Sequence, residues 1–483
     1  MIASLGPLAS LLAAAGDPPQ LLPARSQMGF TLGFHIILVP LGVVFPAMML
    51  IANYIGLRKN DPDALRLAER WSKVAGVTFA VGAVTGTVLT FEMGVLWPGL
   101  FSRFGDVIGL PFALEGIFFF LEAIFISIYI FGWRRLPPWA HFWTGVPVAL
   151  SGIGGALMVV AANSWMNQPS GFTTDAAGNV TSVNVWSAIF NRAVKYEFPH
   201  MYFAALVAAG FLVASPYAVG MLRGRRDRYH RLGFIIPFTI AAIAIPIQMV
   251  IGDSTARAIY NDQPIKFAAI ELNTTTGADK PEILLGHLNS DGTVSGGFDI
   301  PGLASWLSDP STGKATVVQG LDSVPPQDRP PNTAVNVVHL AWDLMIGAGT
   351  ALLLLAAWYA FIMWRRRDRL GEMKWFLWGA AIAPILAYAA LESGWVVTEV
   401  GRQPWIVYNI LRTADAVTNT GERAVWTSFG LVLLLYAVLA TAAVLVIRGM
   451  TKRWRARDIP DEDVPYGPRP TLEEAEAPAG GGS

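Results

Sequence analysis

The sequence predicts an all-α integral membrane protein, a bundle of nine transmembrane helices with its N-terminus outside and its C-terminus in the cytoplasm. Three observations predict this fold: an apolar composition, long apolar segments, and an uneven distribution of Lys and Arg. Of the 483 residues, 53% are hydrophobic and only 14% are charged, whereas soluble domains are about 25% charged. The mean hydropathy is +0.45. The chain therefore belongs to the membrane class.

Nine segments are long and apolar enough to span a bilayer, which takes about 20 residues of helix. They lie at residues 28–56, 74–97, 108–132, 141–163, 198–221, 232–251, 335–363, 375–397 and 424–447. The first is the clearest, because residues 26–57 contain no Asp, Glu, Lys or Arg. Only helices or closed barrels can span lipid, and barrel strands are short and alternate in polarity. These continuous segments therefore predict helices.

The basic residues orient the bundle. Of the 35 Lys and Arg, 22 lie in the segments that follow the first, third, fifth, seventh and ninth spans. Short cytoplasmic loops carry such an excess. This distribution puts those segments and the C-terminus in the cytoplasm and the N-terminus outside.

Five regions follow from this topology. We expect an N-terminal interfacial segment (1–27), helices 1–6 (28–251), an extracytoplasmic loop (252–334), helices 7–9 (335–448) and a cytoplasmic tail (449–483). A signal peptide is the alternative for the first 16 residues, but the basic n-region is missing, so an interfacial helix is favoured. The tail is rich in acidic residues, Pro and Gly, which is typical of disorder. The formal charge of zero gives no indication of a nucleic-acid partner.

Several ionisable side chains fall inside the predicted spans, where such residues are costly and often functional. On the predicted topology, those of six helices lie toward the outer face: His35, Glu92, Glu115, Glu122, His200, His339, Glu392, Glu399 and Arg402, with Met345 among them. Helix bundles build cofactor sites from facing helices in this way. The chain has no cysteine, which excludes disulfides, iron–sulfur clusters, thiolate-bound zinc and cysteine catalysis. Haem held by His, Met or carboxylate therefore fits best.

Each of these residues also has a structural interpretation. A single His in a membrane helix more often bonds a neighbouring helix than a metal, and a single Met usually fills the core. Glu92 could be an interfacial residue, and His339 is favoured as structural, as are His141, His230 and His287. Glu115 and Glu122 are seven residues apart, so they share one helix face about 10 Å apart along the axis. They could form a proton relay or bond a neighbouring subunit.

Five motifs together resemble subunit I of cytochrome bd-type quinol oxidases, over about residues 28–448. They are "GFHIILVP", "LEGIFFFLE", "ANSWMNQP", "QPIKFAAIE" and "GRQPW". The resemblance implies a multi-pass protein of the bacterial cytoplasmic membrane. It also implies a terminal oxidase that oxidises quinol and reduces oxygen to water.

The resemblance implies three haems, namely haem b558, haem b595 and haem d. His200 and Met345 match the two ligands of haem b558. His35, Glu115 and Glu399 match ligands at the high-spin pair, and which haem occupies which of these sites stays open. Trp395 matches the tryptophan that lies among the haems, Glu122 matches the carboxylate of the proton path, and Arg402 could pair with a haem propionate. Whether the third haem is a chlorin or another b haem also stays open.

Lys266 and Glu271 match the functional pair of the family's quinol-oxidation loop. The resemblance implies that quinol is oxidised at the outer face and that electrons pass through haem b558 to the high-spin haems. It also implies that protons for water come from the cytoplasm, so that proton motive force arises without pumping. A second membrane subunit is expected, and in some members a small single-helix subunit joins them. Menaquinol and ubiquinol are both compatible with the sequence.

This chain departs from well-known members in two places. Its loop is short, and Asp343 stands where some members have a basic residue two positions before the methionine. Two other classes of membrane protein also carry ionisable residues inside their spans. A proton-coupled transporter should show inverted repeats and broken helices, which the sequence does not indicate. A structural haem-bearing subunit does not fit the full set of ligands.

Overall fold

The computed structural model describes residues 16–456 and 465–466 of the chain. The described part contains nine helices that are long and apolar enough to cross a membrane. They are α2 (Leu21–Lys59), α3 (Pro62–Leu96), α4 (Pro98–Gly132), α5 (Pro138–Asn167), α7 (Val194–Leu222), α8 (Arg228–Asp262), α11 (Asn332–Arg365), α12 (Lys374–Val400) and α14 (Glu422–Ala456). All nine predicted spans are confirmed as helices. The interfacial helix expected for the first 16 residues and most of the expected disordered tail lie outside the described residues.

The helices are longer than the predicted spans at several ends. The first long helix starts at Leu21, seven residues before the expected boundary, and α8 continues to Asp262, eleven residues into the expected loop. Local capping explains one such extension. At the start of α3, the Asp61 carboxylate accepts the backbone N–H groups of Asp63 and Ala64 at 3.1 and 3.2 Å. Pro62 follows at the first helical position, where its missing N–H costs nothing.

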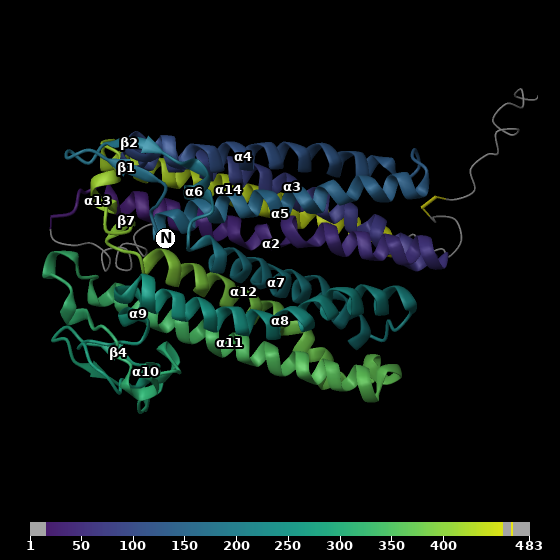
Figure 1. Ribbon diagram of the computed structural model, residues 1–483. Helices are drawn as coiled ribbons and strands as arrows, with labels where there is room; N and C mark the ends of the chain where they lie inside the picture. The colour runs from purple at the N-terminus through teal and green to yellow at the C-terminus, as the bar shows by residue number, and fades with distance from the viewer. Residues whose placement is uncertain (1–15, 457–464, 467–483) are drawn as a thin grey trace, which may run out of the picture.

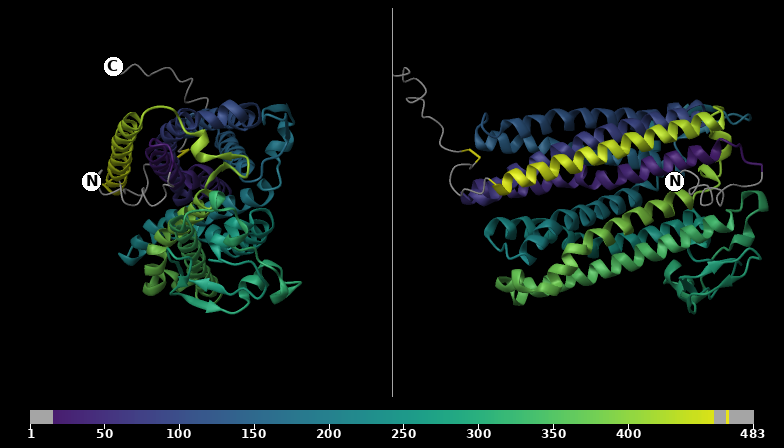
Figure 2. Two further views of the ribbon diagram at one scale, coloured as in Figure 1. Left: turned by 90° about the vertical axis from the view of Figure 1, so that its left-hand side faces the viewer. Right: turned by 180° about the vertical axis from the view of Figure 1, so that it is seen from behind.

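The long helices lie side by side in two groups (Figures 1 and 2). In one group α2 packs on α3 and α5, and α4 packs on α5; in the other, α7 packs on α8 and α12, and α11 packs on α12. Contacts between α2 and α7 join the groups. Helix α14 crosses the outside of the first group and contacts α2 and α3. Burial of apolar side chains between neighbouring helices gives each group its own core.

Short elements gather at one end of the bundle, which we call the loop end (Figure 1). They are β1 (Phe172–Thr174), β2 (Val180–Val183), α6 (Val185–Ile189), α9 (Pro264–Ile270), β3 (Glu282–Leu284), β4 (His287–Leu288), β5 (Val294–Ser295), β6 (Phe298–Ile300), α10 (Leu303–Ser308), β7 (Trp405–Val407), β8 (Leu411–Arg412) and α13 (Thr413–Ala416). The strands form four antiparallel pairs: β1–β2, β3–β6, β4–β5 and β7–β8. Three 3₁₀ turns, Gly313–Ala315, Leu321–Ser323 and Pro326–Asp328, complete the segment before α11.

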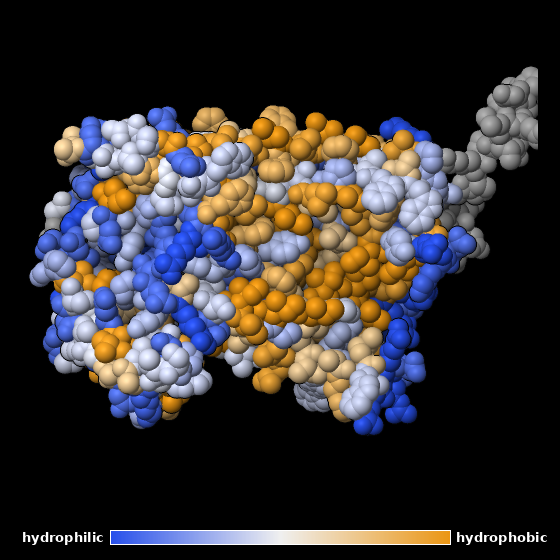
Figure 3. Space-filling model, in the orientation of Figure 1, coloured by the Kyte–Doolittle hydropathy of each residue, from blue (hydrophilic) through white to orange (hydrophobic). Residues whose placement is uncertain are grey.

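The connections at the opposite end, which we call the basic end, carry many of the Arg and Lys residues. One of them is the 3₁₀ helix Arg367–Glu372 between α11 and α12. The face in Figure 3 has a broad apolar band between two polar ends. This surface is the one that a membrane-spanning bundle presents to lipid and to membrane partners.

Candidate functional site

His200 lies in the second turn of α7 and faces α8. The Nε2 atom of Gln248 is 3.2 Å from His200 Nδ1, and the Gln248 Oε1 atom is buried without a hydrogen-bond partner. Amide oxygen and nitrogen can exchange places by a flip. In the flipped form Oε1 would accept a hydrogen bond from Nδ1–H, which leaves Nε2 for a metal. Gly252 on α8 lies against this ring, and a Cβ there would be in ordinary contact with His200 Cε1 at 3.5 Å.

Met345 lies on α11 and faces Gly394 of α12. A Cβ at position 394 would lie 3.2 Å from Met345 Sδ, which is closer than ordinary packing allows. The glycine therefore gives the thioether its room. The α7, α8, α11 and α12 helices share one core, so His200 and Met345 belong to the same helix group.

His35 lies on α2 and faces α3. Its Nδ1 atom is 2.9 Å from the hydroxyl oxygen of Thr85, and that hydroxyl donates to the carbonyl of Gly82 at 3.1 Å. The Thr85 oxygen therefore accepts from His35 Nδ1–H, and this tautomer leaves the Nε2 lone pair available. A second hydrogen bond that fixes the ring is typical of metal-binding histidines. Gly86 leaves space for the ring, since a Cβ added at this position would lie 3.1 Å from His35 Cε1.

Glu399 and Arg402 form an ion pair where α12 ends. An Arg402 guanidinium nitrogen donates to Glu399 Oε2 at 2.6 Å, and the Asn163 amide donates to the other carboxylate oxygen. Arg402 is only 3% exposed. Trp395 lies one turn earlier on α12 and packs against the core of the second helix group. The expected propionate partner Arg402 thus has a carboxylate partner within the chain.

Asn167, the last residue of α5, joins this ion pair to Lys266. Its side-chain oxygen accepts from Lys266 Nζ at 3.2 Å and from Arg402 at 3.3 Å, and its NH2 donates to Glu197 at 2.9 Å. Burial is the main cause that lowers the pKa of Lys266 to about 7, with the charge of Arg402 adding to it and the carboxylates of Glu197 and Glu399 opposing it. A polar network therefore runs from the loop to the end of α12.

Glu271 takes no part in that network. It follows α9 and hydrogen-bonds Glu282 of β3, while Lys266 on the same short helix turns toward Asn167. The two residues expected to act together thus have separate surroundings. Glu271 is 5% exposed, and burial, together with the charge of Glu282, raises its pKa well above the ordinary range.

The remaining expected residues differ in burial. Glu115 and Glu122 lie on one face of α4 and are half-buried. Glu92 is instead 5% exposed and accepts hydrogen bonds from Gln27 at 2.8 Å and Thr31 at 2.6 Å, so its carboxylate is satisfied inside the bundle. His339 is fully buried, with Nδ1 2.7 Å from the Ile270 carbonyl oxygen, as expected for a structural histidine.

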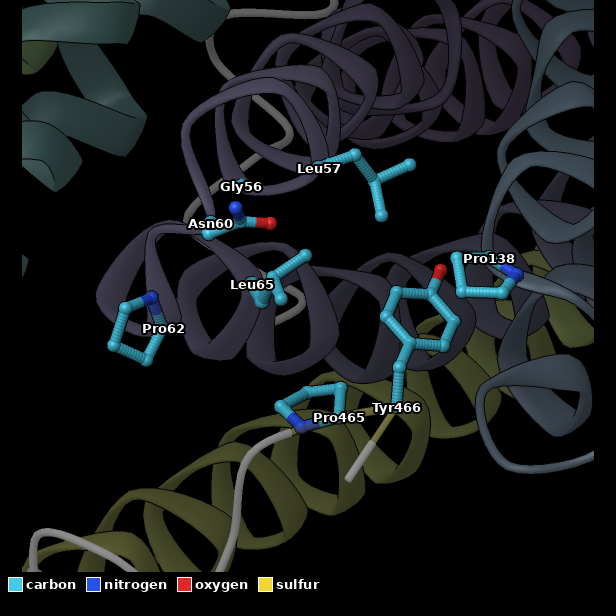
Figure 4. Close-up of a pocket in the computed structure, with 8 residues that line it drawn as sticks. All are labelled: Gly56, Leu57, Asn60, Pro62, Leu65, Pro138, Pro465 and Tyr466. Carbon is cyan, nitrogen blue, oxygen red and sulfur yellow. The ribbon is translucent and has the colours of Figure 1, made fainter. Parts of the chain in front are cut away.

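A surface hollow lies at the basic end, away from these residues (Figure 4). It is lined by Gly56, Leu57, Asn60, Pro62, Leu65, Pro138, Pro465 and Tyr466. The Tyr466 hydroxyl contacts Nδ1 of the buried His141, whose Nε2 lies 2.6 Å from the Tyr129 carbonyl oxygen. This histidine therefore has the structural role expected of it.

The residues present fit haem. His35 and Met345 have glycines opposite their donor groups, and His200 faces a buried amide oxygen that could orient its ring. The described residues contain no group of three or more His, Cys, Asp or Glu that could hold a bare metal ion. Haem iron takes only one or two protein ligands, so separate His, Met and carboxylate side chains suit it.

Comparison with known proteins identifies a family of haem-containing oxidases. The family model for cytochrome bd terminal oxidase subunit I matches residues 23–454. A putative cytochrome bd menaquinol oxidase subunit I of Bacillus subtilis is 32% identical, over 88% of this chain and 95% of the relative. Cytochrome bd-II ubiquinol oxidase subunit 1 of Escherichia coli is 26% identical, over 88% and 95%. A chain of the bd oxidase from Geobacillus thermodenitrificans superposes with a TM-score of 0.83 at 33% identity, over 91% of this chain and all of that one.

The fold and the site thus define a multi-pass bacterial membrane protein with His, Met and carboxylate side chains inside a helix bundle. The chain belongs to the family of subunit I of cytochrome bd terminal oxidases. It is an oxidoreductase subunit, and its family implies haem cofactors and a second subunit.

Proposed function

We propose that this chain is the haem-bearing catalytic subunit that oxidises quinol at the loop end and reduces oxygen to water. The observation that carries this proposal is the polar network from Lys266 through Asn167 to Arg402 and Glu399. It joins the loop that resembles a quinol site to the carboxylate that resembles a haem ligand. When bound, the haems supply electron transfer and oxygen reduction.

Each candidate residue then has a task. His200 and Met345 would hold haem b558, while His35, Glu115 and Glu399 would serve the high-spin haems b595 and d. Arg402 and Glu399 offset each other's charge, which the buried guanidinium of Arg402 needs. Trp395 packs among the helices that carry the haem ligands. Two b-type haems and one chlorin are the expected complement.

Orientation gives the reaction its direction. We place the loop end outside because the basic connections lie at the other end of the bundle. Quinol protons then leave outside, and protons for water enter from the cytoplasm by way of Glu122. Charge is separated without a pump. Subunit II completes the enzyme, with quinol and oxygen as substrates.

We expect the substitution Gly394→Val to displace the Sδ atom of Met345. The added Cβ alone would lie 3.2 Å from Sδ, and the branched methyl groups take more space. We predict that a large part of the low-spin haem signal becomes high-spin in the reduced absorption spectrum. Gly347→Val is the control, because a Cβ there meets nothing within 4 Å. An unchanged low-spin signal in Gly394→Val would count against Met345 as a ligand.

Lys266 provides the test of the proposed quinol site. Its charged form can donate a strong hydrogen bond to a quinol oxygen. Because burial lowers its pKa to about 7, that charge is present below about pH 7 and lost as the pH rises through it. The Lys266→Met variant should raise the quinol KM about 10-fold at about pH 6. The difference from the unmodified enzyme should shrink toward about pH 9.

The measurement is quinol-driven oxygen consumption by the purified two-subunit complex. Lys314→Met is the matched control, because Lys314 is an exposed loop lysine. A KM that does not change at any pH would remove Lys266 from the quinol site. Absence of quinol-driven oxygen consumption in a haem-loaded complex would contradict the proposed function itself.

A further inference from the structure

Glu271 has a carboxyl partner that the motifs do not indicate. Glu282 opens β3, whose strand partner is β6, and its side chain hydrogen-bonds that of Glu271. The two residues are only 5% and 8% exposed. Two carboxylates in such contact cannot both be ionised at low cost, so the pair must hold a proton.

In the described part of the chain, no Lys or Arg is among the charged groups that face the pair. The titratable groups that face it are Asp343 and His339 on α11. His339 Nδ1 lies 2.7 Å from the Ile270 carbonyl oxygen, and its Nε2 lies 3.0 Å from the Gly286 nitrogen and 3.3 Å from Asp343 Oδ2. Asp343 also accepts the Leu285 N–H at 2.7 Å. A proton is therefore what relieves the repulsion in this cluster.

Each of the three carboxyl groups keeps one free oxygen. Glu271 Oε2, Glu282 Oε2 and Asp343 Oδ1 are buried and have no hydrogen-bond partner. Unsatisfied buried acceptors are expensive. The hydroxyl groups of a bound molecule such as a quinol could donate hydrogen bonds to these oxygens. The cluster thus offers acceptors beside the loop expected to bind quinol.

The two carboxyls are not equivalent. Burial raises the pKa of both, but that of Glu271 lies well above its ordinary range, and the hydrogen bond from Glu271 opposes the rise at Glu282. Glu271 is thus the member of the pair that more readily holds the shared proton. A protonated Glu271 cannot accept a proton from quinol. It can do so only after its own proton has moved to Glu282.

We propose that Glu282 is the positioning residue through which Glu271 gives up its proton, so that the pair accepts protons from quinol as a unit. This inference rests on the proposed quinol site. Oxidation of one quinol breaks two O–H bonds and yields a quinone, two protons and two electrons. The electrons leave through the oxidase to oxygen. Glu271 passes its proton to Glu282, accepts one quinol proton in its place, and Glu282 releases its proton to water outside. The second quinol proton can follow by the same cycle.

Glu282 is placed for this release. Its strand pairs with β6, whose residues Phe298, Asp299 and Ile300 are exposed at the loop end. Glu271 itself is flanked in the chain by the buried apolar residues Ile270 and Leu272. Glu282 is therefore the member of the pair whose strand adjoins exposed residues.

The test uses Glu282→Gln in the full-length chain, within the purified two-subunit enzyme. We expect the kcat for quinol to fall about 10-fold with little change in quinol KM, as for loss of a proton acceptor. Removing the negative charge of Glu282 lowers the pKa of Glu271, so the acidic limb of the pH profile should move to lower pH. Oxygen consumption with an artificial one-electron donor should stay normal. Glu282→Asp should restore part of kcat, and Asp299→Asn on β6 is the control.

The outcomes separate the two proposals. If Glu271→Gln loses quinol oxidation but Glu282→Gln keeps the original kcat and pH profile, the role of Glu282 is wrong and the quinol site stands. If Glu271→Gln keeps quinol oxidation, both the role of Glu271 and this inference fail. If Glu282→Gln does not assemble with haem, Glu282→Asp decides. Because Asp keeps the charge at this position, the decisive value is then kcat: a lowered kcat at unchanged quinol KM supports the pair, and a kcat equal to that of the unmodified enzyme overturns it.

Discussion

Replacing His200 with alanine is expected to remove the low-spin haem and to lower quinol-driven oxygen consumption by at least about 100-fold. The imidazole faces Gln248 and Gly252 of α8, and the variant has no other imidazole at that place. Met345 alone is a weak ligand, because a thioether binds ferric iron poorly without its partner. The effect should be large because electrons from quinol enter at this haem in the proposed scheme.

The measurement is the haem content of the purified complex together with its reduced spectrum. His287→Ala is the matched control, since His287 is the exposed residue of the short strand β4. We expect that control to keep all haems and full activity. A His200→Ala enzyme with its low-spin haem intact would show that another residue binds the iron.

Replacing Glu399 with alanine should have the second large effect. The substitution removes the carboxylate that pairs with Arg402 at 2.6 Å and leaves a guanidinium that is only 3% exposed. Breaking one partner of a buried ion pair costs about 3–5 kcal/mol. We expect a lower thermal unfolding midpoint and loss of oxygen reduction by about 100-fold, with the low-spin haem retained.

The double variant Glu399→Ala, Arg402→Met separates stability from chemistry. Removing both charges should recover much of the unfolding midpoint, because no unpaired buried charge remains. Oxygen reduction should stay low, because the carboxylate is still missing. Glu422→Ala at the exposed start of α14 is the control. Recovery of activity in the double variant would mean that Glu399 serves only to neutralise Arg402.

The helices could be predicted from sequence because membrane spans leave a strong local pattern. Long apolar segments locate all nine helices, yet hydropathy does not mark where a helix ends. Caps such as Asp61 with Pro62, and polar turns such as the end of α8 at Asp262, extend helices past the apolar segment. The strands within residues 252–334 are two or three residues long. They are too short for a periodic pattern, so the sequence predicts only a loop there.

The ionisable residues of the site could be named from sequence, but their partners could not. Asn167 and Thr85 are common residue types, and only the packing of helices brings them to Lys266 and His35. Glu197 lies three residues before His200, yet nothing in the sequence connects it with Lys266. The expected pairing of Lys266 with Glu271 illustrates the same limit, because a five-residue spacing does not decide which side of a short helix each one faces.

Glu282 is a candidate site residue that the sequence alone does not indicate. It lies 11 residues after Glu271, in a segment with neither helical nor strand periodicity. The antiparallel pairing of β3 with β6 and the return of α11 place it beside Glu271 and Asp343. Such a contact depends on the folded loop, which no local pattern specifies.

The most direct test of the central claim is a reduced-minus-oxidised absorption spectrum of the purified complex, with haem extraction from the same sample. We predict two b-type haems and one chlorin, one of the b haems being low-spin. Three b haems would contradict the assignment of haem d while leaving the proposed quinol oxidation in place. A well-folded complex without haem would contradict the account of His35, His200, Met345 and Glu399 as the core of an oxidase.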